Sequence, residues 1–260
     1  MNNIFINPEI AFTEIEKNWK LWAKPFKNKT MVIGVSGGID STCVVALACK
    51  IFGSENTIGV SLPCDGQKDI DDVNAVFDHF KIKRFTLDIG DAFTSLKNGI
   101  ENNALELTDQ CITNMPARLR MTALFGVAQC LNGIVINTCN RSESVCGYDT
   151  FGGDNIGSYA PIKNLTKTEV RMLAEWLGTP YNLTYKVPID GLQPYTDEEK
   201  FGFSYNELDA FIRVTNAVEI GLTGKETAEK IKSMYIRNKF KLDIVNIPGP
   251  KFDFLTDTMK

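Results

Sequence analysis

The chain has 260 residues, of which 43% are hydrophobic and 23% charged, proportions that are ordinary for a soluble globular protein. Its formal net charge is -4 and its pI is about 5.2, whereas proteins that bind nucleic acids usually carry a basic excess. No apolar run approaches the roughly 20 residues of a membrane span, and the N-terminus lacks the pattern of a signal peptide. We therefore expect a cytoplasmic protein with no nucleic-acid and no membrane partner.

Short apolar runs alternate with stretches of helical spacing along the first half of the chain. The expected elements are a helix at 8–24, a strand at 30–35, a helix at 41–52 that ends at Gly53, a strand at 57–62, a helix at 69–80, a strand at 84–89, a helix at 114–131 and a strand at 133–138. This alternation predicts the α/β class, with a parallel sheet flanked by helices on both faces. Ligands of such sheets bind beyond the carboxyl ends of the strands.

The last third of the chain is predicted to be a mainly helical region. Thr166 with Glu169, and Ser204 with Glu207, have the spacing of a capping box at the start of a helix. Between these helices, residues 181–203 contain prolines and a glycine and favour a long loop, of the kind that often forms a lid. No repeat, low-complexity tract or flexible linker interrupts the chain, so we expect residues 1–260 to form a single domain.

The seven cysteines contain no CxxC pair, which is the spacing typical of zinc sites. Several lie in apolar runs, as Cys43 does before Val44 and Val45. We therefore expect buried, reduced thiols. The single histidine, His79, falls in a helical stretch, and we expect it on the surface rather than in acid–base catalysis.

The sharpest motif is the turn between the first predicted strand and the helix after it. Its residues are Gly34, Val35, Ser36, Gly37, Gly38, Ile39, Asp40 and Ser41. Adjacent glycines let the backbone approach an anion closely, and a helix start offers unpaired amides and a positive dipole end. Asp40 would repel a phosphate unless a cation lay between them, which suggests Mg²⁺. The turn lacks the lysine of a Walker A loop and the spacing of the GxGxxG fingerprint.

This turn resembles the SGGxDS pyrophosphate loop of the ATP-pyrophosphatase superfamily, whose members cleave ATP between its α- and β-phosphates. Further segments resemble ammonia-dependent NAD synthetase in the expected order, at 117–121, 137–148, 153–167 and 186–209. The resemblance implies a Rossmann-like fold of the adenine-nucleotide α-hydrolase type. It also implies that residues 34–41 and Thr138 bind ATP, that Asp40 and Glu143 hold Mg²⁺, and that Lys167 meets the phosphates of ATP. Asp40 and Lys167 are the expected catalytic residues.

The substrate side departs from the family pattern. The resemblance places Arg118, Phe151, Ser158 and Lys241 at the nicotinate substrate. Phe151 and Ser158 stand where many ammonia-dependent members carry a lysine and an aspartate, and Ile189 stands where a threonine or serine is usual. These differences concern how the nicotinate half is bound and not the residues that form the adenylate. The choice between a dinucleotide and a mononucleotide substrate therefore stays open.

The resemblance implies a ligase that forms a carbon–nitrogen bond. ATP would activate the nicotinate carboxylate of deamido-NAD as an adenylate, pyrophosphate would leave, and ammonia would then displace AMP to give NAD. The alternatives are amidation of nicotinate mononucleotide, a tRNA-modifying enzyme of the same superfamily, and a nucleotide-binding relative without catalysis. Family members form homodimers, and we expect Phe5, Trp19, Trp22 and the helix at 114–131 in the interface.

Overall fold

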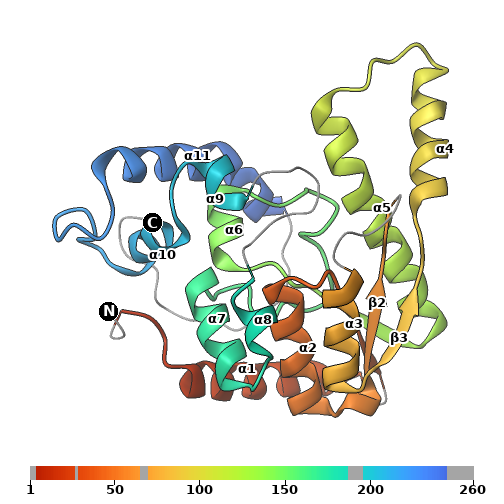
Figure 1. Cartoon of the computed structure of the whole chain (residues 1–260), viewed down its shortest axis with the longest axis horizontal. Helices are drawn as coiled ribbons and strands as arrows, with labels where there is room; N and C mark the ends of the chain where they lie inside the picture. Colours follow the sequence, from red (N-terminus) through yellow and green to blue (C-terminus); the bar gives the residue numbers. More distant parts are fainter. Residues whose placement is uncertain (1–3, 27–28, 65–69, 187–195, 245–260) are drawn as a thin grey trace.

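The computed structural model describes residues 4–26, 29–64, 70–186 and 196–244. Within them, four parallel strands form one sheet in the order β3-β2-β1-β4 (Figure 1). The strands are β1 (Thr30–Gly34), β2 (Thr57–Ser61), β3 (Lys83–Thr86) and β4 (Gly133–Ile136). β1 is central and pairs Val32 with Ile58 of β2 and with Val135 of β4. The wholly parallel pairing confirms the predicted α/β class.

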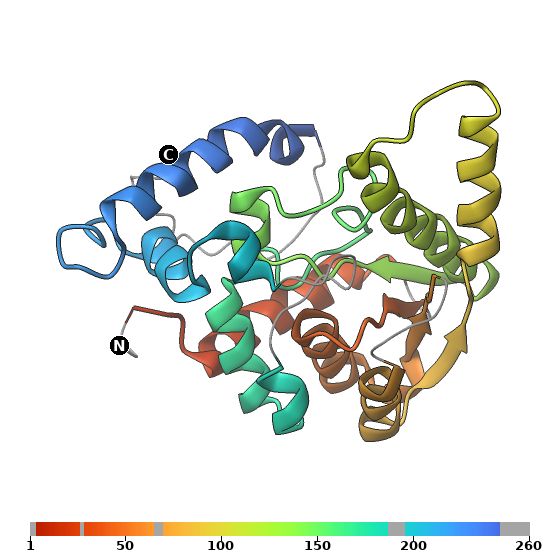
Figure 2. The same cartoon turned by 45° about the horizontal axis from the view of Figure 1, so that its top comes forward.

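Helices connect and cover the strands. Their bounds are α1 (Pro8–Ala23), α2 (Ile39–Phe52), the 3₁₀ turn η1 (Ser54–Asn56), α3 (Ile70–Phe80), α4 (Gly90–Glu101), α5 (Asp109–Cys130), α6 (Arg141–Cys146), α7 (Lys167–Trp176), α8 (Tyr181–Thr184), α9 (Asp197–Phe201), α10 (Tyr205–Arg213) and α11 (Lys225–Ile244). Figures 1 and 2 show α9, α10 and α11 grouped on one side of the molecule and the α4–α5 pair on the other.

Both faces of the sheet are covered, as predicted. On one face, α1, α2, α3 and α7 bury a core with Ile33 and Ile136, and Trp19 stacks on Tyr159 with 5.3 Å between ring centroids. On the other face, α5 packs Met121 and other apolar side chains against the sheet. A third apolar cluster joins α6, α9, α10 and α11. No helix in the described part of the chain is both long and apolar enough to cross a membrane.

One expectation about the surface is wrong. Trp19 is 0% exposed and lies in the core between α1, α2 and the sheet. Because a side chain buried within one chain cannot contact another, Trp19 is excluded from a dimer interface. Trp22 is half-buried and packs on Tyr159, with 4.8 Å between the ring centroids, and Phe5 is half-buried.

The predicted helix starts are confirmed, and the predicted loop is only partly correct. Thr166 with Glu169 and Ser204 with Glu207 both form reciprocal capping boxes. The segment 181–203, expected as a loop, begins with α8 and contains α9, because Thr196 and Glu199 form a further capping box. Pro188, Ile189, Gly191 and Pro194, on which the loop and part of the substrate prediction rested, lie outside the described residues.

The thiol prediction holds only in part. Cys43 and Cys146 are buried, four cysteines are half-buried, and Cys130 at the end of α5 is exposed. Burial raises the pKa of the Cys146 thiol to about 12, so this group stays protonated. His79 is exposed near the end of α3, as expected.

Candidate active site

The glycine-rich turn leaves the start of α2 open. Gly37 has φ +79°, the left-handed conformation that glycine adopts most readily. The Gly38 amide donates to Ser36 Oγ at 3.2 Å, and Ser41 Oγ donates to the Gly38 carbonyl at 3.0 Å. Gly38 occupies the N-cap position and has no side chain to cap the first amides of the helix. The hydrogen bonds hold the turn, and the first amides of α2, which no side chain caps, suit an anion.

The neighbouring strand brings a second set of polar groups to the same edge of the sheet. β4 lies beside β1, and the chain after β4 runs through Thr138, which is half-buried, into α6. Asn140 caps α6 by accepting from the Glu143 amide at 3.0 Å. Its Nδ2 also donates to Asp40 Oδ1 at 2.8 Å. Asn140 thus links the segments that follow β4 and β1, through a contact between residues 100 positions apart in sequence.

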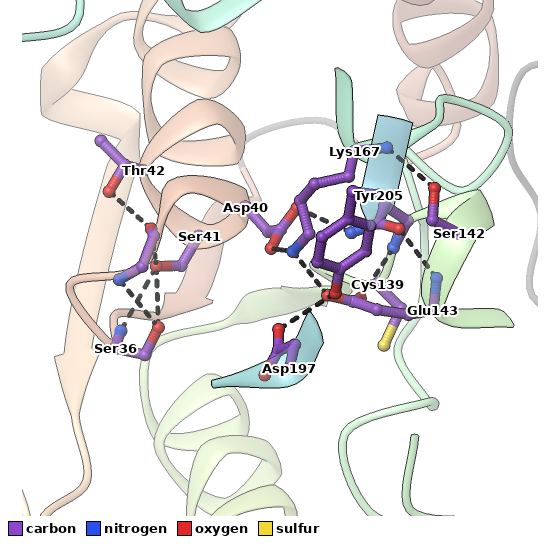
Figure 3. A network of polar contacts seen from close by, with 12 residues as sticks. Ser36, Asp40, Ser41, Thr42, Cys139, Ser142, Glu143, Lys167, Asp197 and Tyr205 are labelled. Atoms are coloured by element: carbon purple, nitrogen blue, oxygen red, sulfur yellow. Dashed lines mark hydrogen bonds and ion pairs between the residues drawn. The ribbon is translucent and has the colours of Figure 1, made fainter. Parts of the chain in front are cut away.

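Lys167 lies between two carboxylates (Figure 3). Its Nζ is 2.5 Å from Asp40 Oδ2 and 2.8 Å from Glu143 Oε1. The Lys167 side chain is 2% exposed, against 17% for Asp40 and 15% for Glu143. Burial alone would lower the pKa of Lys167, but the two carboxylates raise it, so the ammonium stays charged. Burial raises the pKa of Glu143, an effect that Lys167 opposes and Asp40 reinforces.

This cluster has a net charge of about -1 when both carboxylates are ionised, because one ammonium faces two of them. Carboxylate oxygens are the ligands that Mg²⁺ prefers, and Mg²⁺ commonly takes one or two of them and completes its shell with water and phosphate oxygens. Among the described residues, no group of three or more histidine, cysteine or acidic side chains is placed to hold a metal ion. Asp40 and Glu143 are two carboxylates that could hold such a metal together with phosphate oxygens.

Other residues around Lys167 were not predicted as site residues. The ring of Tyr205, on α10, lies 5.1 Å from Lys167 Nζ, and its hydroxyl donates to Asp197 at 3.0 Å (Figure 3). Burial raises the pKa of Tyr205 well above its usual value. Asn140 was identifiable, because Asn140 and Glu143 have the spacing of a capping box. Tyr205 lies in the segment 186–209 that resembles the family, but no local pattern predicts its contact with Lys167, because the packing of α10 brings them together.

The predicted substrate residues fall into two groups. Arg118, on α5, is exposed, and its Nε donates to the Phe151 carbonyl at 3.1 Å. Lys241, on α11, donates to the Gly147 carbonyl at 2.7 Å and the Asp149 carbonyl at 2.6 Å.

Arg118, Phe151 and Lys241 therefore meet around residues 147–151, where the rings of Phe151 and Phe240 are 6.3 Å apart between centroids. Ser158 lies beside β4 instead, and its amide donates to the Val135 carbonyl at 2.8 Å.

The parallel sheet defines an α/β protein of the Rossmann-like type. Its glycine-rich turn opens onto a helix without a side-chain cap, beside an acidic pair, and this geometry suits an anion. A family model described as NAD synthase matches residues 15–245. The chain belongs to the NAD synthase family.

Three comparisons describe its relatives. An NH(3)-dependent NAD(+) synthetase from Pyrococcus horikoshii is 39% identical over 186 residues, which is 71% of this chain and 71% of that protein. One from Carboxydothermus hydrogenoformans is 33% identical over 224 residues, which is 84% of this chain and 88% of that protein. The solved structure of NMN synthetase from Francisella tularensis has a TM-score of 0.81 and 30% identity, and covers 94% of this chain and 99% of that chain.

The geometry of the turn predicts the effect of adding one methyl group. A Cβ on Gly37 would lie 2.9 Å from Asp72 Cβ and 3.2 Å from the Val73 amide nitrogen, in addition to the strain at φ +79°. We expect Gly37→Ala to lower the free energy of unfolding by about 1–3 kcal/mol in urea denaturation. Gly126→Ala is the matched control, because this exposed helical glycine has nothing within 4 Å of an added Cβ. It should raise stability by about 0.5–1 kcal/mol; equal effects of the two changes would contradict the account.

Proposed function

We propose that the protein amidates the nicotinate carboxylate of deamido-NAD with ammonia and ATP, through an adenylate, and releases AMP and pyrophosphate. The observation that carries the proposal is the cluster of Asp40, Glu143 and Lys167 next to the glycine-rich turn. The names of the curated relatives, NH(3)-dependent NAD(+) synthetases, support the same reaction. We further propose that residues 1–260 act as one domain in the cytoplasm, where the seven free thiols would stay reduced.

The turn is proposed to receive the leaving pyrophosphate. A carboxylate is a poor electrophile, so its oxygen first attacks the α-phosphorus and the bond to the β-phosphate oxygen breaks. The amides at the start of α2, with the hydroxyls of Ser36 and Ser41, would bind the negative charge that moves onto the pyrophosphate. Ammonia nitrogen then attacks the acyl carbon, AMP leaves with its oxygen, and a proton is released.

Asp40 and Glu143 are proposed to hold Mg²⁺, with Thr138 beside the nucleotide. A bound Mg²⁺ supplies positive charge to phosphate oxygens. The Lys167 ammonium occupies the space between the two carboxylates. Since a divalent ion and an ammonium repel each other, we propose that Lys167 turns away from the carboxylates and toward the phosphates when Mg²⁺ and ATP bind. The two carboxylates would then face the Lys167 ammonium before Mg²⁺ binds, and Mg²⁺ afterwards.

A second candidate reaction is the amidation of nicotinate mononucleotide by the same chemistry. It is favoured by the likeness to the NMN synthetase of Francisella tularensis and by Phe151 and Ser158 at the substrate side. Arg118 donates to the Phe151 carbonyl, so the backbone of residue 151 contacts a second residue that is proposed to bind the substrate. The two reactions differ only in the nucleotide carried by the nicotinate.

Direct assay tests both candidates. Purified protein with ATP, Mg²⁺ and ammonium is given deamido-NAD or nicotinate mononucleotide, and amide product, AMP and pyrophosphate are quantified. We expect equal amounts of the three products and a higher kcat/KM for deamido-NAD; a preference for the mononucleotide would select the second candidate. Absence of pyrophosphate with either substrate would refute both. Asp40→Ala should fold and release no pyrophosphate.

Removing the lysine predicts a change in how the protein responds to Mg²⁺. Lys167→Met leaves two largely buried carboxylates without their ammonium, and we expect it to cost about 3–5 kcal/mol of folding free energy. Mg²⁺ without nucleotide should recover part of this loss by binding the folded state, and should raise the Tm of the variant more than that of the wild type. Lys50→Met, which removes a lysine from beside the Phe12 and Trp176 rings, is the control. The same Mg²⁺ response in all three proteins would contradict a metal role for the carboxylates.

We also propose a homodimer that pairs through the α4–α5 side. Gly90 is the one buried residue of α4, and α4 and the start of α5 project beyond the sheet (Figure 1), whereas the rest of α5 packs on it. Three large apolar side chains are exposed on this side: Leu96 at 45%, Leu105 at 61% and Ile112 at 39%. Pairing with a second copy would remove this apolar surface from water.

The dimer proposal predicts the effect of a charge on this surface. Leu96→Asp should convert the dimer to a monomer in size-exclusion chromatography with light scattering, because a carboxylate would be buried without a partner. Ile236→Asp changes a residue on α11 that is 74% exposed, and should leave the oligomeric state unchanged. A wild-type monomer, or a dimer that survives Leu96→Asp, would be evidence against this interface.

A further inference from the structure

A buried carboxylate on α10 connects the two helices that carry Glu143 and Lys167. Asp209 is 0% exposed. One of its oxygens, Oδ1, accepts from Ser142 Oγ at 2.5 Å, and the other, Oδ2, accepts from the Thr168 amide at 2.7 Å. Ser142 lies on α6, immediately before Glu143, and Thr168 lies on α7, immediately after Lys167. Both oxygens are thus engaged with neighbours of the charged cluster.

Ser142 extends the link to Lys167 itself. Its Oγ accepts from the Lys167 amide at 2.9 Å while it donates to Asp209. The Lys167 and Thr168 amides belong to the first turn of α7, where a helix has no acceptors of its own for its amides. Ser142 of α6 accepts from the Lys167 amide, and Asp209 of α10 accepts from the Thr168 amide. Thr166 and Glu169 instead accept from each other's amides in the capping box. The start of α7 is therefore held from two directions.

A role in holding other residues in place explains a buried carboxylate at position 209 better than packing does. Burial raises its pKa to about 6, against the hydrogen bonds from Ser142 and Thr168, which lower it. Its partners in the described part of the chain are hydroxyl and amide donors, and the positive end of the α7 dipole favours its negative charge. An apolar residue would fill this place without the cost of burying a carboxylate, but it would leave the Thr168 amide and the Ser142 hydroxyl without an acceptor.

We propose that Asp209 is a positioning residue for the amidation reaction, and that it acts through Ser142 and the Thr168 amide. It holds α6 and α7 so that the Lys167 ammonium can bind the carboxylates of both Asp40 and Glu143. In the same arrangement, Glu143 of α6 and Lys167 of α7 both face ATP. This role rests on the proposed function. A displacement of these groups by about 1 Å is enough to lower the rate of a positioned reaction about 100-fold.

Two variants and a control test the role. Asp209→Asn keeps the size of the side chain but exchanges one acceptor for a donor, and Ser142→Ala removes the link to Lys167 while it leaves Asp209 in place. Ile212→Ala, on the same helix, removes a 0% exposed side chain of the apolar cluster and leaves the hydrogen bonds of Asp209 intact. The melting temperature, kcat, and KM for ATP and for the nicotinate nucleotide are measured for each.

We expect both polar variants to lower kcat about 10- to 100-fold and to leave KM for the nicotinate nucleotide within about twofold of the wild type, because the groups around Phe151 are not changed. Ile212→Ala should lower the melting temperature without this loss of kcat. If Asp209→Asn does not fold, Ser142→Ala decides the question alone. A kcat for the folded polar variants within about twofold of the wild type, or an equal loss in Ile212→Ala, would overturn the positioning role.

The two proposals fail in different ways. If the wild-type protein releases no pyrophosphate with either nicotinate nucleotide, the proposed function is wrong. If the wild type is active and the folded Asp209→Asn and Ser142→Ala proteins are equally active, the reaction stands and only the role of Asp209 is wrong.

Discussion

One lysine ammonium between two carboxylates is the interaction on which the arrangement of the site depends. Asp40, Glu143 and Lys167 come from three different helices and are largely buried, and each carboxylate would repel the other if the ammonium were absent. Removing one partner from a buried ionic group is far more costly than the net contribution of the intact group. The cluster therefore couples the glycine-rich turn to α6 and α7.

The parallel sheet explains why these groups meet. β1 and β4 are neighbours, so the segments that follow them, the turn before α2 and the loop before α6, leave the sheet at the same edge. Asn140 joins the two segments by capping α6 and binding Asp40. The C-terminal helices support this edge from outside, since α10 provides Asp209 and Tyr205, and Lys241 of α11 binds the carbonyls that precede Phe151. Side chains that are distant in sequence thereby support the edge of the sheet where the glycine-rich turn lies.

Local signals in the sequence were sufficient for much of this architecture. The apolar runs gave β1, β2 and β4 nearly to the residue, and the serine and threonine capping boxes gave the starts of α7 and α10. The glycine-rich turn was recognisable because glycine, serine and aspartate follow a strand directly. β3 was expected to extend to Ile89, but it ends at Thr86. The Leu87 amide still donates to the carbonyl of Ser61 at the end of β2, and the Ile89 amide to that of Pro63 just after it.

Features that depend on long-range packing could not be predicted. The family resemblance implies that Asp40 and Lys167 serve the same nucleotide, but not their direct contact, which joins residues 127 positions apart. The contacts of Asp209 and Tyr205 depend on how α10 packs on α6 and α7. Trp19 was misplaced because its helical spacing does not tell which face of α1 meets the sheet. Lys241 is predicted at the substrate, and its ammonium binds the backbone carbonyls of Gly147 and Asp149, a contact that no local pattern encodes.

The arrangement can be tested in a crystal structure with Mg²⁺ and a non-hydrolysable ATP analogue. We expect Asp40 and Glu143 to hold the metal, the β- and γ-phosphates to contact the amides of the turn, and the Lys167 ammonium to have moved from the carboxylates to the phosphates. A triphosphate bound elsewhere, with Lys167 still between its two carboxylates, would contradict it.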